Sequence, residues 1–499
     1  MNIYLLPALH GEGVSTVVPE VATCPGLFYA TPAQDGILSR IRIPGGILDR
    51  KQCDVIADIA EQFGGGYVDV TNRANLQIRE INTGINPQVL QLLQNVGLGS
   101  PNSRVDHIRN IMTSPTAGID RQELIDTRPF VKAWDNYIAT NPHLGELSAK
   151  FSVCFDGRGK IRVCDRPNDI AFVATLIKDS VYFRLHLSVG EKGETPIDVR
   201  VLVQPEECLP VLAALADVYL QNSNIKSDRK PRLREIIKIL GIDGYLQEVE
   251  SLISTGLFRS HVEHETLGEK YQHIGIHPQR QPNLFYIGVV LPLGRLQTEQ
   301  LRRLAALATQ CGSGTIRLTP WQNLLITDIP NQLLPEVEDE IAQLGLDYSP
   351  SNIKSAMVAC SGIKGCKSAA TDTKTHALSL VKHFNKKHNI HVPINIHFTG
   401  CEKSCAQHGK SDITLLGVKI VSENRTSEAY QIYVGDGEEK FGRELYQNVT
   451  ITQLPQILEQ ILKMYQIHRQ NNHESLGEFA NRYAIAELKQ LFSCVKEQN

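Results

Sequence analysis

An internal repeat limits the fold of this chain more than any other feature of its sequence. Residues 44–81 and 292–329 align without a gap at a constant offset of 248 positions. A single duplication over so long a separation excludes a solenoid, whose repeats are shorter and more numerous. The identical pairs include Pro44/Pro292, Gly46/Gly294, Leu48/Leu296, Ala57/Ala305, Ala60/Ala308, Gly64/Gly312, Gly66/Gly314, Thr71/Thr319, Asn75/Asn323, Leu76/Leu324, Ile78/Ile326 and Ile81/Ile329.

Each copy has the pattern of a strand, a helix and two further strands. In the first copy, alternating residues up to Pro44 predict a strand that ends in a Pro-Gly-Gly turn. Residues 48–63 carry apolar side chains at helical spacing, and the glycines at 64–66 end the helix. Residues 67–70 and 76–81 are expected to be strands around a polar turn. The chain is therefore predicted to be an α+β protein.

The repeat also organises the domains. A chain of 499 residues would ordinarily hold about three domains. The duplication instead indicates two copies of one unit, each with an associated lobe. The predicted domains are a first half-domain at 24–100, a first lobe at 101–278, a second half-domain at 284–348 and a second lobe at 349–499.

Charge and hydropathy argue against two classes of partner. The chain has 51 Lys and Arg against 54 Asp and Glu, a net charge of −3, whereas nucleic-acid binders are normally basic. No stretch approaches the roughly 20 apolar residues that span a bilayer. Residues 1–9 lack the basic region of a signal peptide. We therefore expect a cytoplasmic protein with no nucleic-acid or membrane partner.

Four of the 11 cysteines form two close pairs. Cys360 and Cys366 enclose five residues, and Cys401 and Cys405 enclose three. Two such pairs can converge on a [4Fe–4S] cluster or on zinc, and unligated thiols are the remaining alternative. The spacing favours the cluster, because structural zinc loops usually hold two to four residues between ligands. The other cysteines are expected to be structural: Cys24, Cys53, Cys154, Cys164, Cys208, Cys311 and Cys494.

The cysteine pairs resemble the cluster motif of the sirohaem nitrite and sulfite reductase superfamily. In that superfamily the last cysteine, here Cys405, also bridges the cluster to the sirohaem iron. Segments 40–46, 71–77, 108–110 and 474–482 are similar to its other motifs. The resemblance implies an internally duplicated nitrite/sulfite reductase-like fold with ferredoxin-like half-domains and cluster-binding lobes. It also implies a 4Fe-4S cluster and sirohaem or another iron centre as cofactors.

Within the superfamily, the chain is most similar to the precorrin-3B synthases. The supporting segments are 24–26, 109–118, 155–157 and, most specifically, 399–409. This resemblance implies a monooxygenase that hydroxylates precorrin-3A, an anionic tetrapyrrole, at C-20 with lactone formation in aerobic cobalamin biosynthesis. Two alternatives stay open. One is a ferredoxin-dependent nitrite or sulfite reductase with sirohaem, and the other is an iron–sulfur electron carrier or redox sensor.

Basic residues of the first half of the chain are the predicted substrate site. Arg40, Arg109 and Lys150 match the anion-binding positions of the superfamily, and the resemblance implies that they are catalytic. The reductases usually carry Lys or Asn two residues after the lysine, where this chain has Ser152. Since serine cannot supply that charge, we take the change to favour a substrate larger than sulfite.

Three further arginines of the first copy are candidates for binding carboxylates. Buried carboxylates must be paired, so a tetrapyrrole needs several cations. The resemblance implies that Arg73 contacts the cofactor, and Arg42 and Arg79 are weaker candidates. The second copy has Trp321 in place of Arg73 and Thr327 in place of Arg79. We therefore expect only one of the two pseudo-symmetric sites to bind an anion.

The source of electrons is predicted to be a separate protein. No GxGxxG sequence is present, so a Rossmann nicotinamide domain is not supported. Electrons are expected to come from ferredoxin or from a separate reductase.

Overall fold

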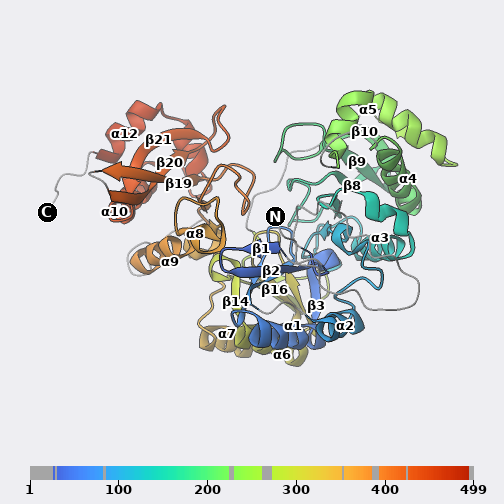
Figure 1. The fold of residues 1–499 in the computed structure, drawn as a ribbon, viewed down its shortest axis with the longest axis horizontal. Helices are drawn as coiled ribbons and strands as arrows, with labels where there is room; N and C mark the ends of the chain where they lie inside the picture. The colour runs from blue at the N-terminus through green and yellow to red at the C-terminus, as the bar shows by residue number, and fades with distance from the viewer. Residues whose placement is uncertain are drawn as a thin grey trace. The chain divides into compact units, whose positions relative to one another are not determined.

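The chain forms two compact units, of which one consists mainly of Ile37–Gly288 and Leu296–Leu344 and the other mainly of Gly345–Asn499 (Figure 1). Cys24 and Cys494, predicted to be structural, lie outside the described residues. No helix among those residues is long and apolar enough to cross a membrane. The computed structural model describes residues 26–28, 31–82, 86–223, 230–260, 272–350, 353–384, 393–422 and 425–493.

Two five-stranded sheets lie at the centre of the larger unit, and each takes one strand from the other repeat. Their orders are β1-β2-β5-β4-β14 and β12-β13-β16-β15-β3. β3 (Ile47–Asp49) belongs to the first repeat yet pairs with β15 (Thr315–Leu318) of the second, with Leu48 opposite Ile316. The exchange interlocks the two predicted half-domains. The other strands are β1 (Thr31–Ala33), β2 (Gly36–Ile41), β4 (Tyr67–Val70), β5 (Leu76–Ile81), β12 (Gly275–Pro278), β13 (Leu284–Val289), β14 (Arg295–Gln297) and β16 (Leu324–Pro330).

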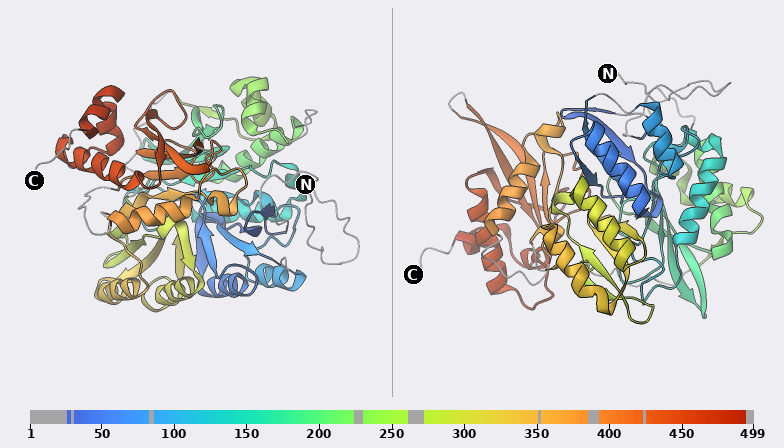
Figure 2. Two further views of the ribbon diagram at one scale, coloured as in Figure 1. Left: turned by 60° about the vertical axis from the view of Figure 1, so that its left-hand side comes forward. Right: turned by 90° about the horizontal axis from the view of Figure 1, so that it is seen from below.

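The repeated helices lie side by side on one face of these sheets (Figure 2). A glutamine shared by the two repeats begins each helix in the same way. Gln52 accepts from the N–H of the N-cap residue, and Gln300 does the same one repeat later. Each helix stops at the glycine that follows it, Gly64 or Gly312. The helices are α1 (Arg50–Phe63) and α6 (Thr298–Cys311), with α2 (Pro87–Asn95) and α7 (Leu334–Gln343) beside them.

Unusual backbone angles recur at matching positions of the two repeats. Gly46 and Gly294 have φ of +73° and +71°, and Ala74 and Gln322 have φ of +53° and +62°. Because L-residues other than glycine rarely adopt positive φ, coincidence at the second pair is a strong sign of common geometry. The predicted duplication of an α+β unit is confirmed.

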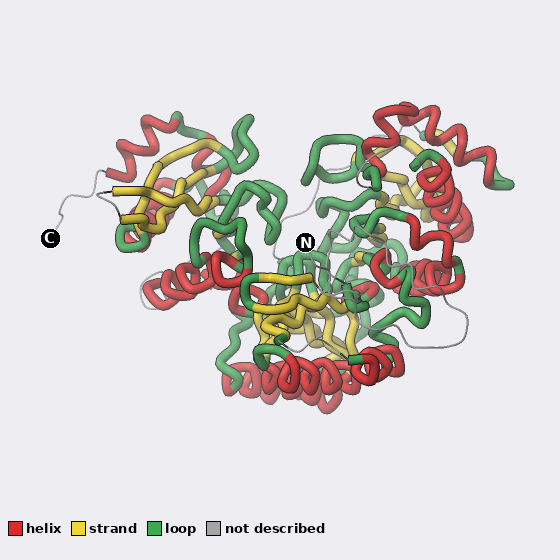
Figure 3. The backbone as a smooth tube through the Cα atoms, in the orientation of Figure 1, coloured by secondary structure: helices red, strands yellow, loops and turns green. Residues whose placement is uncertain are grey.

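The two lobes share the order and directions of five strands, although no sequence repeat was found between them, and β11 adds a sixth strand to the first lobe. In the first lobe β6, β7 and β8 pair in parallel, and β9 and β10 continue antiparallel. In the second lobe β17, β18 and β19 are parallel, and β20 and β21 antiparallel. Helices pack against the sheet in each lobe (Figure 3). The duplication therefore includes the described parts of both lobes as well as the half-domains.

The elements of the lobes have the following bounds. The first lobe contains β6 (Ile111–Thr113), α3 (Arg128–Thr140), β7 (Val153–Asp156), β8 (Ile170–Ile177), β9 (Ser180–Leu187), β10 (Ile197–Val203), α4 (Cys208–Gln221), α5 (Leu233–Leu252) and β11 (Phe258–Arg259). The second contains β17 (Val358–Ala359), α8 (Gly362–Gly365), α9 (Thr373–Phe384), β18 (Ile396–Thr399), β19 (Ile413–Ser422), β20 (Arg425–Val434), β21 (Arg443–Thr450), α10 (Leu454–His468), α11 (Leu476–Asn481) and α12 (Ile485–Ser493).

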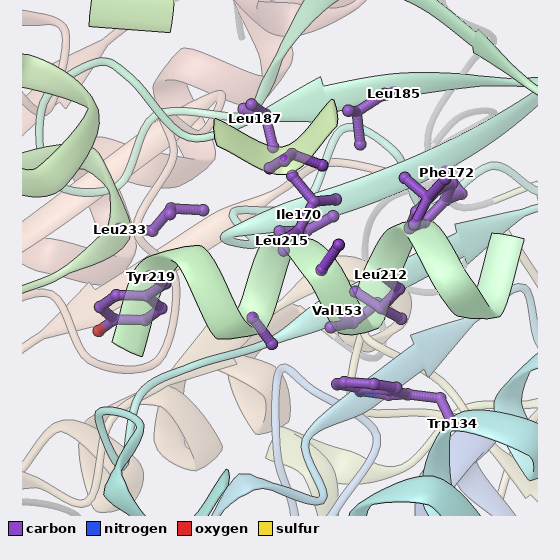
Figure 4. Close-up of a cluster of buried hydrophobic side chains, with 14 of the residues drawn as sticks. Trp134, Val153, Ile170, Phe172, Leu185, Leu187, Leu212, Leu215, Tyr219 and Leu233 are labelled. Atoms are coloured by element: carbon purple, nitrogen blue, oxygen red, sulfur yellow. The ribbon is translucent and has the colours of Figure 1, made fainter. Parts of the chain in front are cut away.

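The first lobe holds α3 in place through its own hydrophobic core (Figure 4). Trp134 of α3, Phe172 of β8 and Leu212 of α4 are fully buried. Burying a side chain of this size stabilises the fold by about 2–3 kcal/mol. The hydroxyl of buried Tyr219 donates to Pro231 O at 2.5 Å, so the core leaves that polar atom satisfied. The opposite face of α3 is thereby available to the site described below.

Candidate functional site: an iron–sulfur lobe and a basic pocket

The four predicted cluster cysteines follow two neighbouring parallel strands of the second lobe. Cys360 comes directly after β17, and Cys401 comes two residues after β18. These strands are paired in parallel, so both segments leave the sheet at the same edge. The N–H of Gly400 donates to Sγ of Cys360 at 3.2 Å, and the N–H of Ala370 donates to Gly400 O at 2.7 Å. The structure thus brings the loops of the two cysteine pairs into contact.

The exposure of the thiols separates these cysteines from the others. Cys360, Cys366 and Cys401 are half-buried, Cys405 is exposed, and all four are free of disulfides. By contrast, burial raises the pKa of the Cys53, Cys154, Cys164 and Cys208 thiols above the usual range. Metal ligation needs thiolates, so the deeply buried thiols are packing residues.

The four thiols and their loops have the chemistry that an iron–sulfur cluster needs. Among the described residues, no three His, Cys, Asp or Glu side chains gather as ligands of one metal ion. The thiolates of a [4Fe–4S] cluster each bind a different iron and therefore lie further apart than the ligands of zinc. Four thiols on loops that supply backbone N–H groups, as Gly400 does, suit that cofactor.

The first lobe has the same two loops, without cysteines at the four matching positions. Thr113 lies opposite Phe155 in β6 and β7, just as Ala359 lies opposite Phe398 in β17 and β18. The N–H of Leu124 donates to Gly157 O at 2.8 Å, which matches the bond between Ala370 and Gly400. This register aligns Ser114 with Cys360, Asp120 with Cys366, Arg158 with Cys401 and Arg162 with Cys405.

Direct hydrogen bonds join the loops of the first lobe. Oδ2 of Asp120 accepts from the N–H of Lys160 at 2.8 Å, and the hydroxyl of Ser114 donates to Ile161 O at 2.7 Å. At two of the four positions, the residue in place of a cysteine therefore contacts the opposite loop, beside the positions of the other pair. We expect the cluster to occupy the corresponding place in the second lobe.

Gly400 has no room for a side chain. A Cβ at this position would lie 2.5 Å from Cβ of Ala369 and 3.1 Å from its Cα. Gly400→Ala should therefore push the Cys401 loop away from the Cys366 loop, at a cost of about 1–3 kcal/mol. We expect the iron content of purified Gly400→Ala protein to fall roughly twofold or more. Gly409→Ala, in the same loop but with nothing within 4 Å, is the matched control; equal iron in both variants would contradict the prediction.

A pocket of about 220 Å³ in the larger unit gathers basic side chains. Arg42 and Arg109 line it from the predicted first half-domain and first lobe, and Arg128, Lys132 and Asp135 line it from α3. The three α3 residues have the i, i+4, i+7 spacing of one helix face. They were not predicted from the sequence, where a helix face of mixed charges is typical of a solvated surface. The signal in the sequence that could have found them is their helical spacing on the face opposite the apolar residues Trp134 and Ile138.

Arg109 is the predicted catalytic residue that lines this pocket. Its Nε and Nη2 donate to Oδ1 and Oδ2 of Asp135 at 2.7 and 2.9 Å, and its Nη1 lies 3.5 Å from Oδ1 of Asp106. Burial lowers the pKa of Arg109, but the two carboxylates outweigh it and hold the pKa above its ordinary value. These contacts use three of the five guanidinium N–H groups, which leaves donors for an anion.

Asp135 reduces the positive charge that an incoming anion meets. We expect Asp135→Asn to lower KM for the anionic substrate about fivefold, since a carboxylate 23% exposed is partly screened. The asparagine still offers one acceptor to Arg109, so kcat should change little. Steady-state kinetics would check this against Asp217→Asn, which removes a carboxylate paired with His143 outside the pocket. An increase in KM would mean that Asp135 mainly orients Arg109.

The other predicted cations lie elsewhere. Arg40 is half-buried on β2 opposite Gln77, and Lys150 is exposed. Arg73 donates to Oδ1 of Asn168 at 2.9 Å and to Pro167 O at 2.6 Å, so it ties a turn of the first repeat to the first lobe. None of the three is a lining residue of the pocket, and neither is Arg79, which is buried in β5.

Ser152 is part of the fold. It is fully buried, and its hydroxyl donates to Oδ2 of Asp169 at 3.2 Å. Asp169 in turn pairs with Arg232 at 2.8 Å. The absence of a charge at this position therefore does not indicate a larger substrate.

The second repeat fills the position of Arg73 with a packed aromatic ring. Trp321 is 6% exposed, with the His273 ring centred 4.8 Å away and the Arg166 guanidinium 5.0 Å from its centre. The two pseudo-symmetric positions thus differ in chemistry as well as in sequence.

Comparison with protein families decides the relationship of this fold. The family described as "Nitrite/Sulfite reductase ferredoxin-like half domain" matches residues 31–96 and 277–344. The family described as "Nitrite and sulphite reductase 4Fe-4S domain" matches residues 104–255. This chain belongs to the nitrite/sulfite reductase family. It is an oxidoreductase, and the predicted fold and the expected [4Fe–4S] cluster with sirohaem are confirmed by that membership. The second match falls on the first lobe, whose loops correspond to those of the cysteine-bearing lobe.

Several relatives of the nitrite/sulfite reductase family resemble the chain over most of its length. It is 30% identical to the ferredoxin–nitrite reductase of Synechococcus elongatus, covering 88% of each chain. It is 32% identical to that of Leptolyngbya laminosa, covering 82% of each chain. Among solved structures, the NirA protein of Mycobacterium tuberculosis matches with a TM-score of 0.77 and 25% identity, covering 91% of this chain and 84% of that one.

These relatives overturn the expected function. The prediction of a precorrin-3B synthase-like monooxygenase is wrong, because relatives that span most of the chain are named ferredoxin–nitrite reductases. The predicted anionic tetrapyrrole substrate and the predicted role in cobalamin biosynthesis are not supported either. The error has a physical source: the cysteine spacing points to a cluster but not to a substrate, and Ser152 is a buried residue of the fold.

Proposed function

We propose that this chain reduces nitrite to ammonium with electrons from reduced ferredoxin. The observation that carries the proposal is the 30% identity to the S. elongatus ferredoxin–nitrite reductase across 88% of both chains. The reaction takes up six electrons and eight protons for each nitrite and releases ammonium and two water molecules. The chain must therefore hold electron carriers, bind a small anion and admit protons.

The cysteine lobe supplies the first of these requirements. Cys360, Cys366, Cys401 and Cys405 would hold the cluster, and the exposed Cys405 thiol would also reach the sirohaem iron. When bound, the cluster supplies single electrons and the sirohaem supplies the iron at which nitrogen–oxygen bonds break. The Gly400 N–H beside Cys360 Sγ stabilises negative charge on sulfur, which favours the reduced cluster.

The basic pocket supplies the second requirement. Arg42 is 2% exposed and the Arg109 side chain 7%, so both guanidinium groups act at low dielectric, where their attraction for an anion is strong. They hold nitrite by charge-assisted hydrogen bonds but cannot release protons near neutral pH, because guanidinium groups stay charged. The exposed ammonium group of Lys132, which lines the pocket, and solvent water would supply protons. Arg40 and Lys150 stay in the proposed catalytic set on resemblance to the superfamily.

The test is a comparison of two anions under the same conditions. Purified protein, reduced ferredoxin and either nitrite or sulfite are mixed without oxygen, and ammonium or sulfide is measured. We expect kcat/KM for nitrite to exceed that for sulfite by at least about tenfold, which corresponds to about 1.4 kcal/mol of transition-state preference. A preference for sulfite, or turnover of neither anion by protein with full cofactor content, would overturn the proposal.

A further inference from the structure

One side chain of the second lobe contacts the segments that carry both cysteine pairs. Asn395 directly precedes β18 and is 6% exposed. Its Nδ2 donates to Ala356 O at 2.8 Å, just ahead of β17, and to Oε1 of Gln407 at 3.2 Å. Nε2 of Gln407 donates back to Oδ1 of Asn395 at 2.6 Å. The two amides therefore form a reciprocal pair, and the bond from Asn395 to Ala356 O links this pair to the segment ahead of the Cys360 strand.

Gln407 holds the Cys405 loop from within. Its Nε2 also lies 3.2 Å from Lys410 O, and its own carbonyl accepts from the hydroxyl of Ser404 at 2.5 Å. Ser404, next to Cys405, is 1% exposed and has φ of +53°. A non-glycine residue keeps such an angle only where its surroundings impose it. The amide pair and the serine thus fix the backbone that presents Cys405.

The base of this arrangement is anchored to the rest of the lobe. The N–H of Asn395 donates to Oδ2 of Asp412 at 2.8 Å, and the N–H of Gly477 donates to Oδ1 of the same carboxylate at 3.0 Å. Asn395 therefore cannot shift without disturbing the start of β19 and the helix α11. A satisfied buried polar network of this kind specifies one geometry.

The first lobe has no equivalent pair. The register that aligns the two sheets puts Ser152 at the position of Asn395 and Cys164 at that of Gln407. In the first lobe the loops are instead joined by hydrogen bonds of Asp120 and Ser114. These two residues occupy the positions of Cys366 and Cys360 in the second lobe. Ligating cysteines cannot make those bonds. The amide pair thus occurs in the lobe that carries the four predicted ligands, and it joins the loops of that lobe without using the ligand positions.

We infer that Asn395 and Gln407 are positioning residues of the iron–sulfur site. Their amide pair sets the distance between the Cys360 strand and the Cys405 loop, and with it the cluster's retention and the N–H groups around its sulfurs. Outer residues that orient ligands commonly change metal affinity about 10- to 100-fold when lost. The inference rests on the cluster of the proposed function and does not depend on nitrite as the substrate.

The first test replaces the amide by an acid. Asn395→Asp sets carboxylate oxygens against Ala356 O and against the acceptor of Gln407. We expect iron per chain to fall at least about twofold and cluster loss to a chelator to become about tenfold faster. In reconstituted protein the cluster potential should become more negative, because N–H donation to sulfur weakens. Asn222→Asp, whose amide donates to Val218 O at 3.0 Å in the first lobe, is the matched control and should keep iron and potential.

The second test restores the pair with its lengths exchanged. Asn395→Gln and Gln407→Asn should each be defective, whereas the double variant should return chelator-driven cluster loss to within about twofold of the unmodified rate. A change in the cluster's reduction potential or absorption spectrum, at an unchanged melting temperature, is a result that a purely structural role would not produce.

Two results would overturn the inference. One is an Asn395→Asp protein with unchanged iron, chelator rate and potential. The other is a double variant no better than the single ones. If Asn395→Asp does not fold, Gln407→Glu at the half-exposed partner is judged by the same readouts. An unmodified protein that holds its cluster but does not reduce nitrite would refute the proposed function and leave this inference standing.

Discussion

Replacing Cys401 with serine is expected to remove the [4Fe–4S] cluster and reduce nitrite turnover to background. A serine hydroxyl stays protonated where a cysteine thiol becomes a thiolate, so one of the cluster's ligands is lost. The larger unit, which contains none of the four cysteines, should fold as before. Iron analysis, visible absorption and a ferredoxin-driven nitrite assay would measure the effect.

The matched control for this substitution is Cys53→Ala. Cys53 is fully buried in α1, and burial together with Asp49 and Asp54 raises the pKa of its thiol far above the usual range. Removing it costs packing energy of about 1 kcal/mol but no ligand. Full cluster content in Cys401→Ser protein, or loss of the cluster in Cys53→Ala protein, would contradict the assignment of the four ligands.

Replacing Arg109 with glutamine is expected to affect both activity and stability. Loss of two charge-assisted hydrogen bonds to the anion should lower kcat/KM for nitrite by about a hundredfold. The substitution also leaves Asp106, 1% exposed, and Asp135 without their cation, which should destabilise the protein by about 3 kcal/mol. Kinetics and urea unfolding would measure the two effects separately.

Arg109→Lys separates charge from geometry. Lysine keeps the positive charge but lacks the planar fork that meets both oxygens of Asp135. We expect it to recover much of the stability and only part of the activity. An Arg109→Gln protein that is destabilised yet keeps kcat/KM within twofold would show that Arg109 supports the fold and does not bind the substrate.

Much of the fold could be predicted from the repeat, because turns and caps depend on local residue types. Gly46, Gly64 and their counterparts mark the same turns in both copies. The exchange of β3 and β14 between the two sheets could not be predicted from the sequence, because three-residue strands carry no pattern that identifies their partners. The duplication of the lobes was hidden for a related reason. The two lobes share a backbone register, but the matching loop positions hold Ser114 and Asp120 in one lobe and Cys360 and Cys366 in the other.

The parts of the candidate site also differ in how far the sequence could predict them. The four cluster ligands stay a prediction from cysteines at close spacing, and the structure brings the loops that carry them into contact. The basic pocket could be predicted only in part, because Arg128 and Lys132 come from a helix face that is defined once Trp134 is buried. The substrate was predicted wrongly. Ser152 was interpreted as a substrate-contacting position, whereas its hydroxyl bonds a buried aspartate.

The measurement that tests the central claim most directly is the yield of ammonium from isotopically labelled nitrite. Purified protein with known iron and sirohaem content is supplied with a limiting amount of reduced ferredoxin in the absence of oxygen. The proposed function predicts labelled ammonium, with six ferredoxins oxidised for each ammonium formed. Oxidation of ferredoxin without labelled ammonium, or no oxidation by protein with both cofactors bound, would contradict it.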